Sequence, residues 1–238
     1  MNKNIIKIPN KSFELAEFIG ILFGDGYIAE YKSGYVLQIA GHKIKDFRYH
    51  KEYIHDLFHN LFGLYPNLIL RKDQNTLYTQ IKSKLLVKFL HENGMPLGKK
   101  EILIIPFWIK KDIKYLKSFI RGYFDTDGSL ILRKRKQNSI SFGSKNKELI
   151  QDLYGAFNEL GYFSCLNKEI QNDKRGFIST IYYLRINRKK DILKFIEEIG
   201  SSNHHKLERI KELHKEWVLW DLNPGFRSAL VHADHLRN

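Results

Sequence analysis

Two aspartates occupy equivalent places in a segment that occurs twice in the chain. Asp25 lies in the sequence Gly-Asp-Gly at 24–26, and Asp127 lies in Thr-Asp-Gly at 126–128. Carboxylate oxygens suit hard divalent cations, Mg²⁺ above all, and paired ions of this kind activate water and stabilise the leaving oxygen in phosphodiester hydrolysis. If the two segments meet in the fold, these aspartates predict a metal-dependent hydrolytic site.

The repeated segment also predicts how the aspartates meet. FIGILFGDG at 18–26 recurs as IRGYFDTDG at 120–128. Small residues lie four apart in both copies, which gives each helix a side that permits close packing against another helix. We expect this helix interface at Gly20, Gly24, Gly122 and Thr126. Two carboxylates that approach each other at helix C-termini repel, so cations should accompany them.

The elements around the repeat indicate an α+β fold with two pseudo-symmetric αββαββα halves. Apolar residues recur with helical spacing, and four alternating stretches, at 27–39, 68–82, 129–142 and 178–187, predict antiparallel hairpins. Gly26 and Gly128 are expected to be left-handed caps where each motif helix ends. The predicted organisation is a first half at 10–98, a linker at 99–113, a second half at 114–200, and a basic helix and tail at 201–238.

Composition indicates a polyanionic partner. The 238 residues carry 40 Lys+Arg against 26 Asp+Glu, a formal net charge of +14. Such a surplus attracts nucleic acid, and a basic run at 133–136 within a hairpin points the same way. The only cysteine, Cys165, can form neither an internal disulfide nor a CxxC metal knuckle. No segment has the length and apolar character of a membrane span or a signal peptide, which predicts an intracellular protein.

The two motifs, each opening a half, resemble those of the LAGLIDADG homing endonucleases, specifically the single-chain kind with two motifs. The resemblance extends over residues 12–200, and the stretch 99–128 is similar to archaeal intron-encoded members. It implies a monomer in which the motif helices pack at the central interface. Saddle-shaped antiparallel sheets would lie in the major groove of a long asymmetric double-stranded DNA site. It further implies cleavage of both strands with short 3′ overhangs, intron homing, and an archaeal cytoplasm rather than an organelle matrix.

The same resemblance implies roles for individual residues. Asp25 and Asp127 would share two or three Mg²⁺ ions, with help from the main-chain carbonyls of Gly24 and Thr126. Mn²⁺ would replace Mg²⁺, and Ca²⁺ would bind without supporting cleavage. Lys43 and Lys145 stand in the place of the lysine of a Gln-Lys pair that often follows the first hairpin in the family, with His42 and Ser144 in place of the glutamines. The resemblance implies that these lysines have a catalytic role, in support of the water network or the scissile phosphate. Asp125, the earlier acid of its motif, inherits no catalytic role.

We expect the DNA to contact the polar residues of the hairpins. These are Tyr31, Lys32, Tyr35, Gln38, Arg71, Lys72, Gln80, Lys82, Arg133, Arg135, Gln137, Ser139, Lys168 and Arg185. The family's central lysine aligns only loosely, near Gln80 or Lys82 in the first half and Arg185 or Asn187 in the second. Strand parity decides which of these side chains faces inward, because a slip of one residue reverses the face.

Three other functions remain open on the sequence. A chain of the same fold could be an RNA-binding intron maturase, or a DNA-binding protein that has lost cleavage. A more remote alternative is a haloacid-dehalogenase-like phosphatase, because FDTDGSL at 124–130 resembles its hhhDxDGT motif. That fold needs a buried parallel strand before the motif, whereas the stretch 114–124 is basic and contains a glycine.

Overall fold

A computed structural model describes residues 6–133, 137–172 and 176–222. The first half consists of α1 (Phe13–Asp25), β1 (Gly26–Tyr31), β2 (Gly34–His42), α2 (His55–Phe62), β3 (Asn67–Leu70), β4 (Thr76–Ile81) and α3 (Lys84–Glu92), with a π-helical segment, Tyr49–Ile54, leading into α2. The second half consists of α5 (Ile113–Thr126), β5 (Gly128–Ile131), β6 (Ser139–Ser144), α6 (Lys147–Glu159), β7 (Cys165–Asn172), β8 (Ile178–Ile186) and α7 (Lys189–Glu198). The short helix α4 (Phe107–Lys110) lies between the halves, and α8 (His204–Leu222) follows them.

Each half contains one four-stranded sheet, ordered β1-β2-β4-β3 in the first half and β5-β6-β8-β7 in the second. All the strand pairs within these sheets are antiparallel. The α+β prediction of two αββαββα halves is therefore confirmed. The phosphatase alternative is wrong, because its motif would have to follow a strand of a parallel sheet. Among the described helices, none has both the length and the apolar character needed to cross a bilayer.

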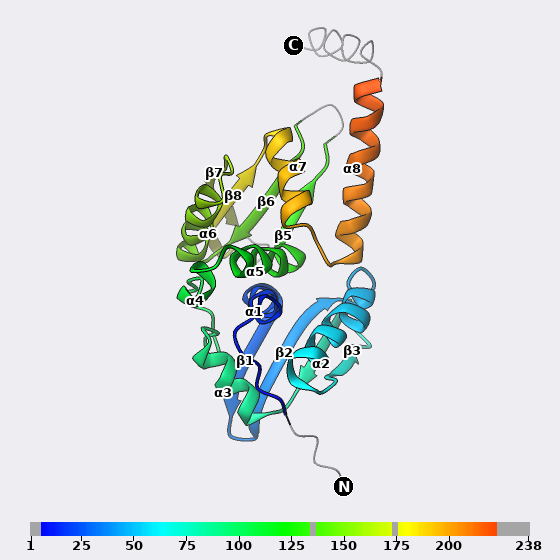
Figure 1. Cartoon of the computed structure of the whole chain (residues 1–238). Coiled ribbons are helices and arrows are strands. Elements are labelled where there is room, and N and C mark those ends of the chain that lie inside the picture. The colour runs from blue at the N-terminus through cyan, green and yellow to red at the C-terminus, as the bar shows by residue number, and fades with distance from the viewer. Residues whose placement is uncertain (1–5, 134–136, 173–175, 223–238) are drawn as a thin grey trace.

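Helices α1 and α5 cross the centre of the molecule and pack against each other, with one half on either side (Figure 1). Helix α1 is buried continuously from Leu15 to Phe23, because its own sheet covers one side and α5 covers another. Ser12 caps its N-terminus by accepting a hydrogen bond from the amide of Leu15 at 3.2 Å. The apolar residues of both halves form one contiguous core around this helix pair.

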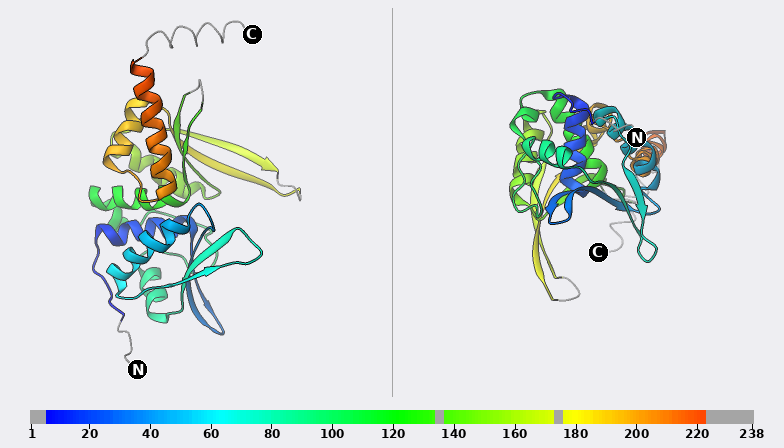
Figure 2. Two further views of the ribbon diagram at one scale, coloured as in Figure 1. Left: turned by 90° about the vertical axis from the view of Figure 1, so that its right-hand side faces the viewer. Right: turned by 90° about the horizontal axis from the view of Figure 1, so that it is seen from below.

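The sheets expose one face each, and their hairpins project to the same side of the molecule, away from most of the helices (Figure 2). On β2 the side chains of Leu37 and Ile39 enter the core, so Gln38 between them lies on the exposed face. On β8 the same alternation buries Leu184 and Ile186 and places Arg185 on the exposed face. We call these two surfaces the open faces.

The structure differs from the sequence predictions at two places. Gly26 is extended, with φ −82° and ψ 155°, and Gly128 has no positive φ either, so neither is a left-handed cap. Both glycines are required for space instead, because a methyl group on Gly26 would collide with Leu22 and one on Gly128 with Phe124. Strand β7 was not predicted. Nearly all of it is exposed, and it therefore lacks the apolar alternation by which strands are recognised.

Candidate active site

The close approach of α1 and α5 places the two motif ends beside each other. A methyl group on Gly20 would collide with the carbonyl oxygen of Phe119, and one on Gly122 with the carbonyl oxygen of Glu17. Near the helix ends, a methyl group on Gly24 would collide with the hydroxyl of Thr126 and would lie 3.4 Å from Cγ of Asp127. Gly20 and Gly122 therefore lie where the two helix backbones touch, and Gly24 meets the side chain of Thr126.

This helix contact also determines the positions of Asp25 and Asp127. Asp25 is the last residue of α1, and Asp127 is the residue after α5. Burial raises the pKa of Asp25 to about 7, and the negative charges of Asp127 and Asp46 add to the effect. The pKa of Asp127 is also raised, chiefly because the surrounding protein removes water from the carboxyl group and so disfavours its charged form. The residue nevertheless reaches the surface. The site concentrates negative charge and favours a cation.

Two lysines partly compensate this charge. Lys100 donates to the carbonyl oxygens of Phe23 and Gly24, at 2.9 and 2.6 Å, at the end of α1. Lys206 donates to the carbonyl oxygens of Phe124 and Gly128, the latter at 2.5 Å, at the end of α5. Burial lowers the pKa of each lysine to about 8, while the nearby aspartates oppose this. Each ammonium thus binds the negative end of a helix dipole and also lies near both aspartates.

The sequence prediction missed these lysines. The residues proposed for the family's central lysine lie on β4 and β8 or just after them, whereas Lys100 and Lys206 lie beyond the last helix of their halves. One signal was available, because a lysine follows that last helix in both halves. Its significance depends on where the chain turns after α3 and α7, and the motif repeat does not reveal that.

Asp125 lies two residues before Asp127 and has different hydrogen-bond partners. It is buried, and it accepts hydrogen bonds from the hydroxyl of Ser201 and, at 2.8 Å, from the amide of Ser202. Burial raises its pKa to about 7, while those hydrogen bonds and Lys206 act in the opposite direction. Asp125 therefore fixes the segment that leads into α8.

The other predicted catalytic and metal-binding residues are Lys43, Lys145, Gly24 and Thr126. Lys43 donates to the carbonyl oxygen of Arg71 at 3.2 Å, and Lys145 is exposed before α6. Neither is among the charges with the largest effects on Asp25. The carbonyl oxygen of Gly24 accepts from Lys100, so a metal would have to share or displace this bond. The hydroxyl of Thr126 donates back to its own helix, to the carbonyl oxygens of Gly122 and Tyr123.

The predicted DNA contacts differ in position, because side chains alternate between the two faces along a strand. Tyr31, Gln38, Gln80, Ser139 and Arg185 lie on the open faces, although Ser139 is buried there. Another group is exposed in loops or beside strand ends and consists of Lys32, Arg71, Lys72, Lys82, Arg133 and Gln137. Arg135 lies outside the described residues.

Two of the predicted contacts do not lie on the open faces. Tyr35 pairs with Glu30 on the helix-covered side of the first sheet, donates to its carboxylate and lies under Lys84. Lys168 lies on the same side of its strand as Leu166, whose partner Leu184 is buried in the core. Both corrections have one cause, since adjacent strand residues point to opposite faces.

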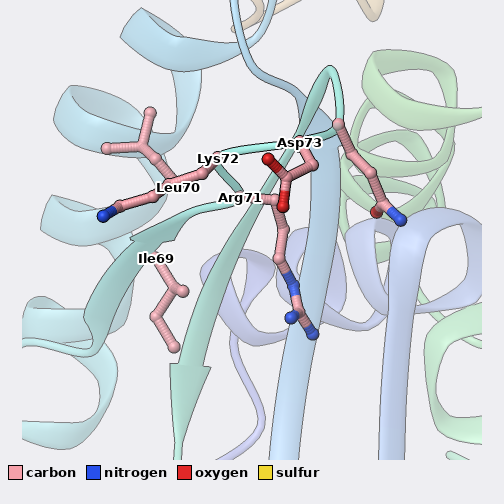
Figure 3. Close-up of a pocket in the computed structure, with 6 residues that line it drawn as sticks. Ile69, Leu70, Arg71, Lys72 and Asp73 are labelled. Carbon is pink, nitrogen blue, oxygen red and sulfur yellow. The ribbon is translucent and has the colours of Figure 1, made fainter.

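The tip of the β3–β4 hairpin shows how the loop residues are arranged. Residues 69–74 line an open hollow there, and Figure 3 shows Arg71 and Lys72 leaving the loop in different directions. The guanidinium of Arg71 lies over the ring of Tyr78, with its Cζ 5.5 Å from the ring centroid. Tyr78 is on the open face of β4, so Arg71 extends that face beyond the strand.

The donor set at the helix ends fits Mg²⁺. Within the part of the chain that the structure describes, no three or more Asp, Glu, His or Cys side chains are grouped to hold a metal ion. Mg²⁺ does not need such a cage, because it keeps several waters and commonly binds one or two carboxylates together with phosphate oxygens of the substrate. Asp25 and Asp127 supply the carboxylates, and a bound cation would relieve the repulsion from Asp127 that contributes to the raised pKa of Asp25.

Comparison with known proteins supports the same architecture. Residues 114–200 match the family model of the LAGLIDADG-like domain. The homing endonuclease I-DmoI, solved in complex with DNA and Ca, is similar with a TM-score of 0.56 and 17% identity, over 84% of this chain and 97% of I-DmoI. The N-terminal LAGLIDADG domain of WhiA is similar with a TM-score of 0.51 and 18% identity, over 87% of this chain and 92% of that domain.

The chain has the LAGLIDADG fold. The resemblance seen in its two motifs is thereby confirmed. Its curated relatives include the replication factor C small subunit of Methanocaldococcus jannaschii, 26% identical over 94% of this chain. They also include the tRNA-splicing ligase RtcB of Pyrococcus abyssi, 25% identical over 78% of this chain. The chain spans only 11% and 22% of the length of those two proteins.

Proposed function

We propose that this LAGLIDADG protein is a site-specific double-stranded DNA endonuclease that hydrolyses phosphodiester bonds with divalent metal ions held by Asp25 and Asp127. The observation that carries the proposal is the meeting of these two carboxylates at the ends of α1 and α5, the helix pair that lies between the two halves. A site with one aspartate from each half can act on two strands. Mg²⁺ is the proposed ion, with Mn²⁺ able to replace it.

The residues of the chain have distinct roles in this proposal. Asp25 and Asp127 bind the metal, which would polarise the phosphate and activate a water molecule when bound. Lys100 and Lys206 are cationic neighbours that stabilise negative charge as it develops on the scissile phosphates. The net charge of +14 and the open faces retain the DNA and set its register.

The strand products follow from the arrangement of the site. The two aspartates are close together at a pseudo-twofold axis, so the two scissile bonds must also lie close in space. In B-form DNA that condition is met across the narrow minor groove, where bonds on opposite strands are staggered by a few base pairs. We therefore propose short 3′ overhangs at one long asymmetric target, recognised by a monomer. Structures of I-DmoI were obtained with DNA and with Mn or Ca, in agreement with this choice of substrate and ions.

The test is cleavage of a randomised duplex library by the purified protein with Mg²⁺, with Ca²⁺ and without metal. Sequencing of cut ends and of retained DNA gives both the target and the overhang. We expect cutting at one long site with Mg²⁺ and retention without cutting with Ca²⁺. Specific retention with no cutting under any metal would contradict the endonuclease and would indicate a binding protein. Retention of the transcribed library in preference to DNA would indicate the maturase alternative.

A further inference from the structure

Each site lysine is carried by a segment that is fastened to the opposite half. Lys100 lies between Gly98, whose amide donates to the carbonyl oxygen of Ile28 in its own half at 2.7 Å, and Glu101. The carbonyl oxygen of Glu101 accepts a hydrogen bond of 2.9 Å from Nδ2 of Asn146, which belongs to the second half. The residue next to Lys100 is thus held from across the interface.

Lys206 is fastened in the reverse sense. It lies in the first turn of α8, three residues after Asn203. Nδ2 of Asn203 donates to Oδ1 of Asp46, in the first half, at 3.2 Å, and to the carbonyl oxygen of Asp125, in the second half, at 3.1 Å. The hydroxyl of Ser202 adds a contact of 3.2 Å to Glu17 on α1. The start of α8 is therefore anchored on both halves.

The two asparagines are both buried, and they make the same kinds of hydrogen bond. Asn146 is 7% exposed and Asn203 is 2% exposed. Each also caps a helix with its amide oxygen, which accepts from the amide of Leu149 at 3.1 Å in one case and from that of His205 at 3.0 Å in the other. A buried amide group that lost its partner would be left with an uncompensated desolvation cost, so these cross-interface bonds are strongly favoured in the folded state.

We infer that Asn146 and Asn203 are positioning residues, each of which holds one site lysine against its motif helix through a side-chain hydrogen bond that crosses between the halves. Asn146 acts on Lys100 through the carbonyl of Glu101, and Asn203 acts on Lys206 through the first turn of α8. Each lysine position then depends on the assembled interface and not on its own half alone. The consequence for strand cleavage rests on the proposed function, whereas the positioning itself does not.

The variants Asn146→Ser and Asn203→Ser separate the two uses of each amide. Serine caps helices about as well as asparagine but lacks the side-chain amide donor. Asn93→Ser is the matched control, because Nδ2 of Asn93 donates to Phe89 within its own half at 2.8 Å. Thermal denaturation of all three variants checks that they are folded. Should Asn203→Ser fail to fold, Asp46→Ala removes the acceptor of the same bond.

The first readout does not require cleavage. The metal-free full-length chain is labelled briefly with an amine-reactive N-hydroxysuccinimide ester, and each lysine is quantified by peptide mass spectrometry. We expect a several-fold faster labelling of Lys100 in Asn146→Ser alone and of Lys206 in Asn203→Ser alone, with both unchanged in Asn93→Ser. Unchanged labelling of both lysines, or equal increases of both in every variant, would overturn the inference.

The second readout is the strand that is cut once the target is known. Asn146→Ser and Asn203→Ser should accumulate nicked plasmid in which opposite strands remain intact, with wild-type affinity for the DNA in Ca²⁺. Loss of the same strand in both variants would show that the lysines are not assigned to separate strands. If the wild-type protein cuts nothing, the proposed function fails, while the labelling result still decides whether the asparagines position the lysines.

Discussion

Gly20 packs directly on the main-chain carbonyl of Phe119, with no room between them for a methyl group. Gly20→Ala should therefore force α1 and α5 apart and lower the free energy of unfolding by about 1–3 kcal/mol, the usual range for overpacking in a core. Gly122→Ala should behave alike, because Gly122 meets the carbonyl of Glu17 in the same way. Chemical denaturation measures both changes.

Gly155 supplies the control for these variants. It lies within α6, and a methyl group there would meet no neighbouring atom within 4 Å. Gly155→Ala should raise the free energy of unfolding by about 0.5–1 kcal/mol, since alanine loses less backbone entropy than glycine in a helix. If Gly20→Ala were as stable as Gly155→Ala, the close packing of the two motif helices would be refuted.

Asp25→Asn should stabilise the metal-free protein in a pH-dependent way. The pKa of Asp25 is raised from 3.8 to about 7, so the folded state binds more protons than the unfolded state between these values. The contribution of Asp25 to stability is therefore greatest at low pH and is lost as the pH rises towards 7. Asparagine, which stays neutral, avoids this loss. We expect a gain that grows from pH 4 to pH 8 and reaches on the order of 2 kcal/mol.

The measurement is the melting temperature of both proteins over that pH range in a chelating buffer. Parallel curves for the wild type and Asp25→Asn would contradict the raised pKa. Addition of Mg²⁺ should reverse the order at pH 8, because the ion stabilises the wild-type carboxylates and has lost one of its ligands in the variant.

Cleavage should respond in the opposite direction from stability. Asp25→Asn and Asp127→Asn each remove a carboxylate from the proposed metal site, so the rate of double-strand cleavage should fall by at least ~10²–10³-fold, the range observed when one preorganised electrostatic group is removed. Affinity for the target in Ca²⁺ should change much less, because the open faces are intact. Plasmid cleavage and fluorescence anisotropy test the two statements. Full activity in both single variants would refute the role of these aspartates.

The two faces of the second sheet give a matched pair of charge deletions. Arg185 lies on the open face of β8, where it pairs with Glu169, and Lys168 lies on the other side of the adjacent strand β7. Arg185→Ala should weaken DNA binding and reduce the salt dependence of log K by about one phosphate contact. Lys168→Ala should leave the slope unchanged. The slope is obtained from binding titrations at several NaCl concentrations, and a reversed order would mean that the opposite face contacts DNA.

Local patterns in the sequence were sufficient for much of the fold. The two copies of the motif, each followed by a change from helical to alternating periodicity, predicted the central helix pair and both sheets. The spacing of Gly20 and Gly24 predicted the contact that brings Asp25 and Asp127 together. These predictions succeeded because they depend on residues that are neighbours along the chain or equivalent in the repeat.

The same patterns did not predict on which face of a sheet each side chain lies. Tyr35 and Lys168 were expected on the DNA side, and the register of their strands turned them away. A strand reverses its side chains with every residue, and a single polar residue in a strand carries no local mark of the side on which it lies. Only the pairing with Glu30 and Tyr182 decides the face of these two residues.

The sequence by itself determined the composition, the repeat and the two aspartates, because these features are written in consecutive residues. The tertiary structure alone decided that Lys100 and Lys206 join those aspartates and that Asn146 and Asn203 hold their segments across the interface. These contacts connect residues that are far apart in the chain. Their positions result from the packing of one half against the other, and no local propensity encodes that packing.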